Sequence, residues 1–157
     1  MHEKFMMEAI KQAKKAFAKD EIPVGAIIVS EGKIIAKAYN MVEKKKLATS
    51  HAEILAIEKA SKKYPSFRVE NAEMYITLEP CAMCAGAIAN ARINKVYFGA
   101  YEEKSGCAVS LYPVLENNGL NHKVEFEGGI LEKECKKLIT EYFANKRERK
   151  KKQKNAL

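Results

Sequence analysis

The chain has 157 residues, of which 47% are hydrophobic and 31% charged, with 8 Gly and 4 Pro. This length corresponds to one ordinary domain, and this composition excludes a disordered or fibrous protein. The formal net charge is +8, of which +6 comes from 7 basic residues and 1 Glu between positions 145 and 154. We expect a single domain over 1–157 with a basic C-terminal helix or tail over 145–157.

The first predicted element is an amphipathic helix. Apolar residues recur at helical spacing from Phe5 to Phe17, with Lys and Glu between them. Because these charges interrupt the apolar residues, the segment lacks the apolar core of a signal peptide, and no stretch approaches the length of a membrane span. We expect a cytoplasmic protein with no membrane partner, in which the 4 Cys are metal ligands or buried thiols rather than disulfides.

Strand and helix signals follow in order along the rest of the chain. Two apolar runs after Pro23 are separated by Ser30-Glu-Gly32, which predicts a two-stranded hairpin. Beyond a polar loop, helix formers and strand formers alternate. This order favours an α/β fold, a three-layer α/β/α sandwich with a mixed five-stranded sheet. The expected strands are 24–29, 33–39, 74–78, 96–98 and 122–127, and the later helices are 51–60, 81–91 and a long helix after Gly128-Gly129.

Two motifs, His51-Ala-Glu53 and Pro80-Cys81-Ala-Met-Cys84, open two of these helices. Cys81 and Cys84 are three positions apart, so their sulfurs share one helix face, and a helix start lowers the cost of deprotonating them. His51 and Glu53 are about 200° apart on a regular helix, so His51 must lie at the helix start to reach the same ion. We predict that His51, Cys81 and Cys84 bind zinc where the two helix starts meet.

The number of ligands indicates what such a zinc ion does. Structural zinc sites usually close with a fourth protein ligand, whereas catalytic sites leave that position to water. A carboxylate beside this water can take its proton and deliver it to a ring nitrogen and a leaving amine, which makes Glu53 the candidate catalytic residue. His-x-Glu followed by Pro-Cys-x-x-Cys is typical of zinc-dependent nucleobase deaminases. We therefore expect a hydrolytic deaminase with one zinc ion per subunit.

Either motif alone is weak evidence, since Cys-x-x-Cys is more often a structural zinc half-site or a redox pair. The main rival is a structural zinc closed by a fourth ligand, and Cys107 is the other Cys that could reach it. Cys135 falls in the apolar stripe of the last predicted helix, so we predict a buried core thiol there.

The chain resembles the bacterial tRNA-specific adenosine deaminases of the cytidine deaminase-like superfamily over nearly its whole length. The most specific segment is Thr77-Leu-Glu-Pro-Cys-Ala-Met-Cys-Ala-Gly86, and the others are 22–26, 50–54, 95–100 and 129–131. The resemblance implies a cytidine deaminase-like fold and conversion of the wobble adenosine of a tRNA anticodon to inosine. It also implies a homodimer whose partner is the anticodon stem-loop of tRNA.

The resemblance extends to residues that would bind the substrate. Basic side chains can neutralise phosphates, and aromatic side chains can stack on unpaired anticodon bases. The alternative for the basic tail is a solvated helix end, and the alternative for Phe143 is core packing one turn from Ile139. The residues implied are Asn40 at the nucleoside, Ala52 offering backbone to the base, Lys104 and Ser105 in a loop lining the RNA groove, and Phe143, Lys146 and Arg147 at the end of the last helix.

The chain also departs from the family pattern. Leu47-Ala48 stands where Asp-Pro is usual, Tyr101-Glu102 where Arg-Asp is common, and Val109 replaces a usual Gly. None of these is a predicted metal ligand, so they bear on substrate preference and not on the reaction. Two alternatives remain, a deaminase of free guanine, adenine or cytidine and a non-catalytic zinc-stabilised RNA-binding module. Glu53 argues against the second, because a structural zinc needs no carboxylate two residues after a ligand.

Overall fold

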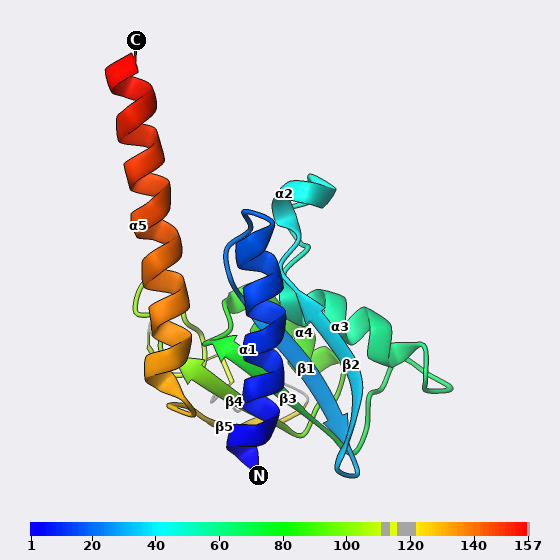
Figure 1. The fold of residues 1–157 in the computed structure, drawn as a ribbon. Coiled ribbons are helices and arrows are strands. Elements are labelled where there is room, and N and C mark those ends of the chain that lie inside the picture. The colour runs from blue at the N-terminus through cyan, green and yellow to red at the C-terminus, as the bar shows by residue number, and fades with distance from the viewer. Residues whose placement is uncertain (111–113, 116–121, 157) are drawn as a thin grey trace.

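The protein is described by a computed structural model that covers residues 1–110, 114–115 and 122–156. Ten elements make up this part of the chain (Figure 1). In chain order they are α1 (His2–Ala18), β1 (Gly25–Ser30), β2 (Lys33–Tyr39), α2 (Val42–Lys45), α3 (Ala52–Ser61), β3 (Ala72–Leu78), α4 (Ala82–Asn90), β4 (Lys95–Ala100), β5 (Glu125–Glu127) and α5 (Glu132–Ala156).

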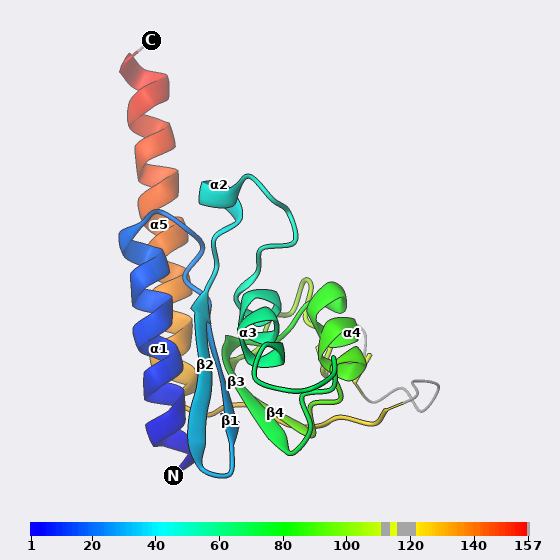
Figure 2. The ribbon, with the colours of Figure 1, turned by 90° about the vertical axis from the view of Figure 1, so that its right-hand side faces the viewer.

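A five-stranded sheet in the order β2-β1-β3-β4-β5 forms the middle layer. β1 runs antiparallel to both β2 and β3, whereas β3, β4 and β5 are parallel. Helices α1 and α5 cover one face of the sheet, and α3 and α4 cover the other (Figure 2). The predicted three-layer α/β/α sandwich with a mixed sheet is therefore confirmed.

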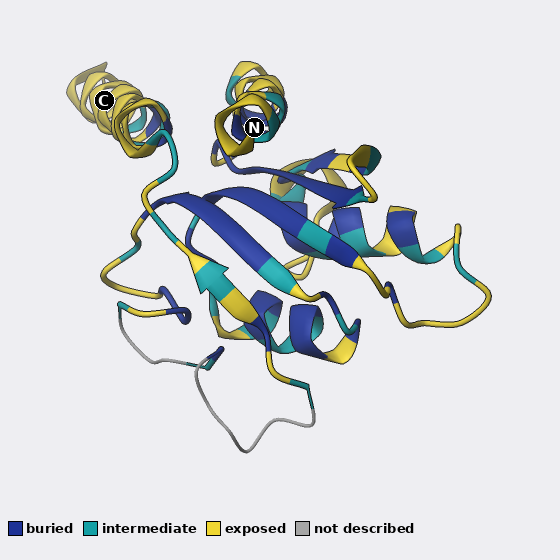
Figure 3. Ribbon diagram, turned by 90° about the horizontal axis from the view of Figure 1, so that it is seen from below, coloured by how far each residue is buried: buried dark blue, intermediate teal, exposed yellow. Residues whose placement is uncertain are grey.

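Apolar side chains fill the space on both sides of the sheet, and the central strands are buried along most of their length (Figure 3). Cys135 of α5 is 1% exposed and belongs to a cluster of buried apolar residues, which confirms the predicted core thiol. Its sulfur would lie 2.3 Å from a Cβ at Gly99, so only glycine lets α5 approach β4 this closely. No helix in the described part of the chain combines the length and apolar character needed to cross a bilayer.

The structure differs from the sequence prediction at several element boundaries. The polar loop after β2 contains the one-turn helix α2, and β4 is longer than the predicted 96–98. The last strand begins at Glu125 instead of position 122, because its neighbour β4 begins at Lys95 and offers no earlier partner. Helix α4 begins at Ala82 instead of position 81, because Cys81 has an extended backbone and serves as the N-cap.

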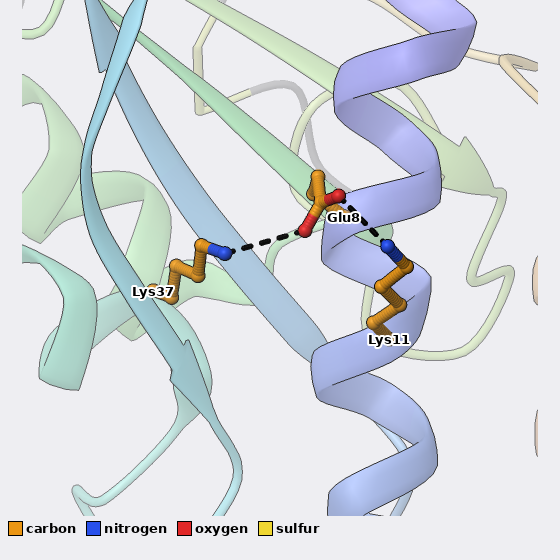
Figure 4. A network of polar contacts seen from close by, with 3 residues as sticks. All are labelled: Glu8, Lys11 and Lys37. Atoms are coloured by element: carbon orange, nitrogen blue, oxygen red, sulfur yellow. Dashed lines mark hydrogen bonds and ion pairs between the residues drawn. The ribbon is translucent and has the colours of Figure 1, made fainter.

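Exposed ion pairs link α1 to strand β2. Glu8 of α1 pairs with Lys11 at 3.0 Å and with Lys37 of β2 at 3.3 Å (Figure 4). The hydrogen bonds from Lys11 and Lys37 lower the pKa of Glu8. Exposed pairs of this kind contribute little stability, so they orient α1 on β2 without driving folding.

Helix α5 continues to Ala156, and its C-terminal half projects beyond the rest of the protein (Figure 1). Arg149 holds the start of this projection through two hydrogen bonds to the Asp20 carboxylate, at 2.8 and 3.2 Å. The hydroxyl of Tyr142 donates to the Asp20 backbone oxygen at 3.2 Å. The basic segment thus begins as a helix anchored to the end of α1.

Candidate active site

The three predicted metal ligands come together at one point. The Nδ1 atom of His51 lies 3.7 Å from the sulfur of Cys81 and 3.6 Å from that of Cys84. One potential ligand atom from each residue lies within 4.8 Å of the other two. Zn–S bonds of about 2.3 Å and Zn–N bonds of about 2.0–2.1 Å in tetrahedral geometry separate N and S by about 3.6 Å. The three side chains are therefore already spaced to hold a zinc ion.

Two helix starts produce this arrangement. His51 is the N-cap of α3 and Cys81 is the N-cap of α4, and both have extended backbones. An N-cap residue outside the helical turn can direct its side chain differently from the residues that follow it. Helix α4 consists largely of small residues, and it packs against α3 on the same face of the sheet. The metal candidates thus come from two helices in direct contact.

Hydrogen bonding between the two cysteines shifts their pKa values in opposite directions. The hydrogen bond from Cys84 lowers the pKa of the Cys81 thiol to about 4 against the opposing effect of burial, and His51 lowers it further. The same interaction with Cys81, followed by burial, raises the pKa of Cys84. Hydrogen bonding to Cys81 also raises the pKa of His51. The lowered pKa of Cys81 favours its thiolate, the form that binds metal.

Glu53 lies in the first turn of α3 and is only 4% exposed. Burial raises the pKa of its carboxyl group, and the charge of His51 partly opposes this effect. Together with His51 and Cys81 it lines a pocket of about 190 Å³. A buried carboxyl group with a raised pKa in a pocket is suited to giving and taking protons near neutral pH.

Four of the predicted substrate-binding residues line the same pocket, namely Asn40, Ala52, Ser105 and Phe143. Asn40 is buried; its side-chain nitrogen donates to Ile22 O at 3.2 Å, and its oxygen accepts from the Val42 N–H at 3.3 Å. Phe143 is 37% exposed and belongs to neither core cluster of the described residues. It therefore stands at the pocket and not in the core, contrary to the packing alternative.

The other predicted contacts lie outside the pocket lining. Lys104 is exposed in the loop after β4, where its backbone N–H donates to the Glu102 side chain at 3.1 Å. Lys146 and Arg147 lie on α5 beyond Phe143, and Arg147 is exposed.

Cys107 does not join the metal cluster found among the described residues. Its thiol instead donates to Ser105 O at 3.6 Å, and its pKa is raised by burial. This position gives no support to Cys107 as a fourth ligand.

Sequence reasoning assigned no role to several residues that line the pocket. They are Ile22, Val24, Leu78, Glu79, Glu102 and Ile139. Glu79 is the one charged side chain of this group that is fully buried, at 3% exposed. Burial opposes its ionisation, but hydrogen bonds from Ser110, Val109 and Glu102 hold its pKa below the ordinary value. The sequence feature that points to Glu79 is its position directly before the Pro80-Cys81 motif.

Comparison with known proteins places the chain among deaminases. The family model of the MafB19-like deaminases matches residues 1–147. A tRNA-specific adenosine deaminase of Bacillus subtilis (strain 168) is 45% identical over 149 residues, which cover 95% of this chain and 92% of the relative. The protein of the same name from Aquifex aeolicus (strain VF5) is 48% identical over 141 residues, with 90% and 93% covered.

Solved structures agree with these relatives. The chain superposes on a protein from a study of A-to-I editing by tRNA:A34 deaminases with a TM-score of 0.83 and 36% identity, covering 86% of this chain and 98% of that one. The guanine deaminase of Nitrosomonas europaea gives a TM-score of 0.78, but its 22% identity shows a common fold alone; 90% and 84% are covered. The prediction of a deaminase is confirmed, and the chain belongs to the family of tRNA-specific adenosine deaminases.

Proposed function

We propose that the protein converts adenosine to inosine at the wobble position of a tRNA anticodon, with zinc held by His51, Cys81 and Cys84. The observation that carries this proposal is the pocket in which Glu53 lies beside His51 and Cys81, two of the three clustered candidate ligands. The names of the relatives support the choice of tRNA as substrate. When bound, one zinc ion per chain would polarise a water molecule for attack at C6 of adenine.

Glu53 would carry the protons of this reaction. Water adds to C6 and ammonia leaves, so one proton must reach a ring nitrogen and another must reach the departing amine. Burial raises the pKa of this carboxyl group, which favours its taking up a proton. His51 and Cys81 border the same pocket, which keeps Glu53 next to the reacting centre.

The walls of the pocket would position the base. Ala52, Asn40 and Ser105 line the pocket, where they would offer polar contacts to a nucleoside. Phe143 and Ile139 offer apolar surface at the same opening. A single unpaired nucleotide can enter such a pocket, as in other enzymes that act on a base taken out of its stack.

A basic row on α5 supports contact with the RNA backbone. At about 100° per residue, Arg147, Lys150 and Lys154 share the helix face of Phe143, spaced four, three and four residues apart. All three basic side chains are exposed. The row extends about 16 Å from the pocket at 1.5 Å per residue, far enough to meet several phosphates. Lys146 lies beside the row on α5, and Lys104 lies in the loop after β4.

Replacing the basic row residues Arg147, Lys150 and Lys154 by Gln should weaken tRNA binding and flatten its salt dependence. If each residue meets one phosphate of unpaired RNA, the slope of log K against log salt falls by about 2. Binding measured over a series of salt concentrations checks this result. The charge-matched control replaces the exposed Lys4, Lys33 and Lys62 by Gln, none of which lines the pocket. Equal slopes of log K against log salt for both triple variants would indicate that the basic tail is a solvated helix end.

The substrate is tested by incubating the protein with unmodified tRNA bearing an anticodon adenosine and, separately, with free adenosine, guanine and cytidine. We expect inosine in the tRNA and no product from the free compounds. Deamination of free compounds alone would overturn the tRNA proposal and favour the free-base alternative.

We also propose that residues 1–157 form a single deaminase domain, that the protein is a homodimer, and that it acts in the cytoplasm. The family resemblance supports the dimer, and a tRNA substrate supports the location. A molar mass in solution of twice that of the chain is the expected result for the dimer.

A further inference from the structure

The segment 102–110, called here the rim segment, is assembled around the buried carboxylate of Glu79. Backbone N–H groups point at both carboxylate oxygens, and the Ser110 hydroxyl donates to Oε1. These backbone bonds run to Oε2 from Ala108 at 3.1 Å, Val109 at 2.8 Å and Ser110 at 2.9 Å, and to Oε1 from Glu102 at 3.1 Å. One side chain therefore satisfies donors from both ends of the segment.

The fit between Glu79 and the rim segment is close. A Cβ atom at Gly106 would lie 2.4 Å from Cδ of Glu79 and 2.4 Å from the Glu102 backbone oxygen. A backbone hydrogen bond also holds the rim segment, since the N–H of Cys107 donates to Pro80 O at 2.7 Å. The segment is thus fitted to Glu79-Pro80, the two residues before Cys81.

This attachment determines part of the pocket wall. The rim segment contributes Glu102 and Ser105 to the lining. It contains neither helix nor strand over its described length, so no regular backbone pairing holds these residues in place. Hydrogen bonds to an ionised carboxylate are among the stronger ones in proteins, and here they take the place of such pairing. Nothing in the proton transfer assigned to Glu53 requires Glu79.

We propose that Glu79 is a positioning residue, which holds the rim segment so that Ser105 and Glu102 form a preformed wall for the incoming nucleotide. The inference rests on the proposed function and adds a determinant of substrate binding to it. Glu79 acts through the rim segment and has no part in moving protons. Its loss therefore affects the capture of substrate more than the chemical step.

The Glu79→Gln variant tests this role. An amide can keep the three backbone donors at one oxygen, but it then presents an N–H₂ group to the Glu102 N–H. We expect KM for tRNA to rise about tenfold while kcat stays within about threefold, because the lost bonds order the site before substrate binds. Zinc content should remain that of the parent protein. Glu58→Gln, an exposed position on α3, is the matched control and should change neither constant.

A double-mutant cycle separates positioning from a general loss of stability. Gly106→Ala forces a methyl group against Glu79, so it should raise KM by itself. Its effect should be smaller when Glu79 is already Ala, because only the contact with the Glu102 backbone oxygen then remains. Hydrogen exchange at the amides of 106–110 should rise in Glu79→Gln while exchange in α3 and α4 does not change.

The outcomes distinguish this inference from the proposed function. Unchanged KM in Glu79→Gln, additive effects in the cycle, or loss of zinc would each overturn the role of Glu79 while leaving an active deaminase. A parent protein that fails to deaminate tRNA would instead overturn the proposed function, and the exchange of 106–110 would still test the attachment.

Discussion

The Glu53→Gln variant should bind zinc and fold like the parent protein, but its deamination rate should fall by at least about a thousandfold. Gln has the size of Glu and cannot take up or release the proton. Because Glu53 is buried and its pKa is raised by desolvation, a neutral amide at this position costs little folding stability. Initial rates on tRNA, with zinc content measured on the same sample, check the result.

Two further variants give this experiment its controls. Glu53→Ala should also retain zinc, since Glu53 is not among the three clustered ligands. Glu58→Gln replaces an exposed carboxylate further along the same helix and should keep the parent rate. Full activity of Glu53→Gln would contradict the proton-transfer mechanism, and loss of zinc from it would make Glu53 a ligand.

Replacing Cys84 by Ser should reduce the zinc content from about one ion per chain to nearly none and abolish deamination. A serine hydroxyl stays protonated at neutral pH and is a poor ligand for zinc. The side chain is fully buried at 0% exposed, so loss of the metal should also lower the thermal unfolding temperature. Elemental analysis and thermal unfolding, with and without added zinc, measure the two effects.

Cys107→Ser is the matched control for this variant. It is a second buried cysteine near the pocket, but its sulfur donates to Ser105 O and lies outside the cluster. We expect Cys107→Ser to keep one zinc ion per chain and most of its activity. If it lost zinc as Cys84→Ser does, the site would have four protein ligands, and the structural zinc alternative would return.

Much of the fold could be predicted because its signals are local. The alternation of helix and strand formers is enough to predict the layered sheet, and the stripe containing Cys135 is enough to predict a buried face of α5. The boundaries were less predictable, since β5 begins where its partner β4 begins. A strand's length depends on a neighbour that the local pattern does not contain.

The candidate metal ligands and Glu53 were likewise evident from short spacings. His51 and Glu53, or Cys81 and Cys84, are separated by two or three positions, and helix geometry dictates how residues at such spacings lie. The meeting of the two motifs could be predicted because zinc binds both His nitrogen and Cys sulfur. The structure places His51 at the N-cap of α3, as its spacing argument requires, and also places Cys81 at the N-cap of α4.

The sequence by itself thus determined the reactive chemistry of this protein, whereas the tertiary structure alone decided what surrounds it. Glu79 shares the pocket with residues from both ends of the chain, and Asp20 holds Arg149 across 129 positions. Phe143 stands at the pocket and not in the core because of how α5 lies on the sheet. Such contacts depend on how whole elements pack, and no spacing within a few residues encodes that packing.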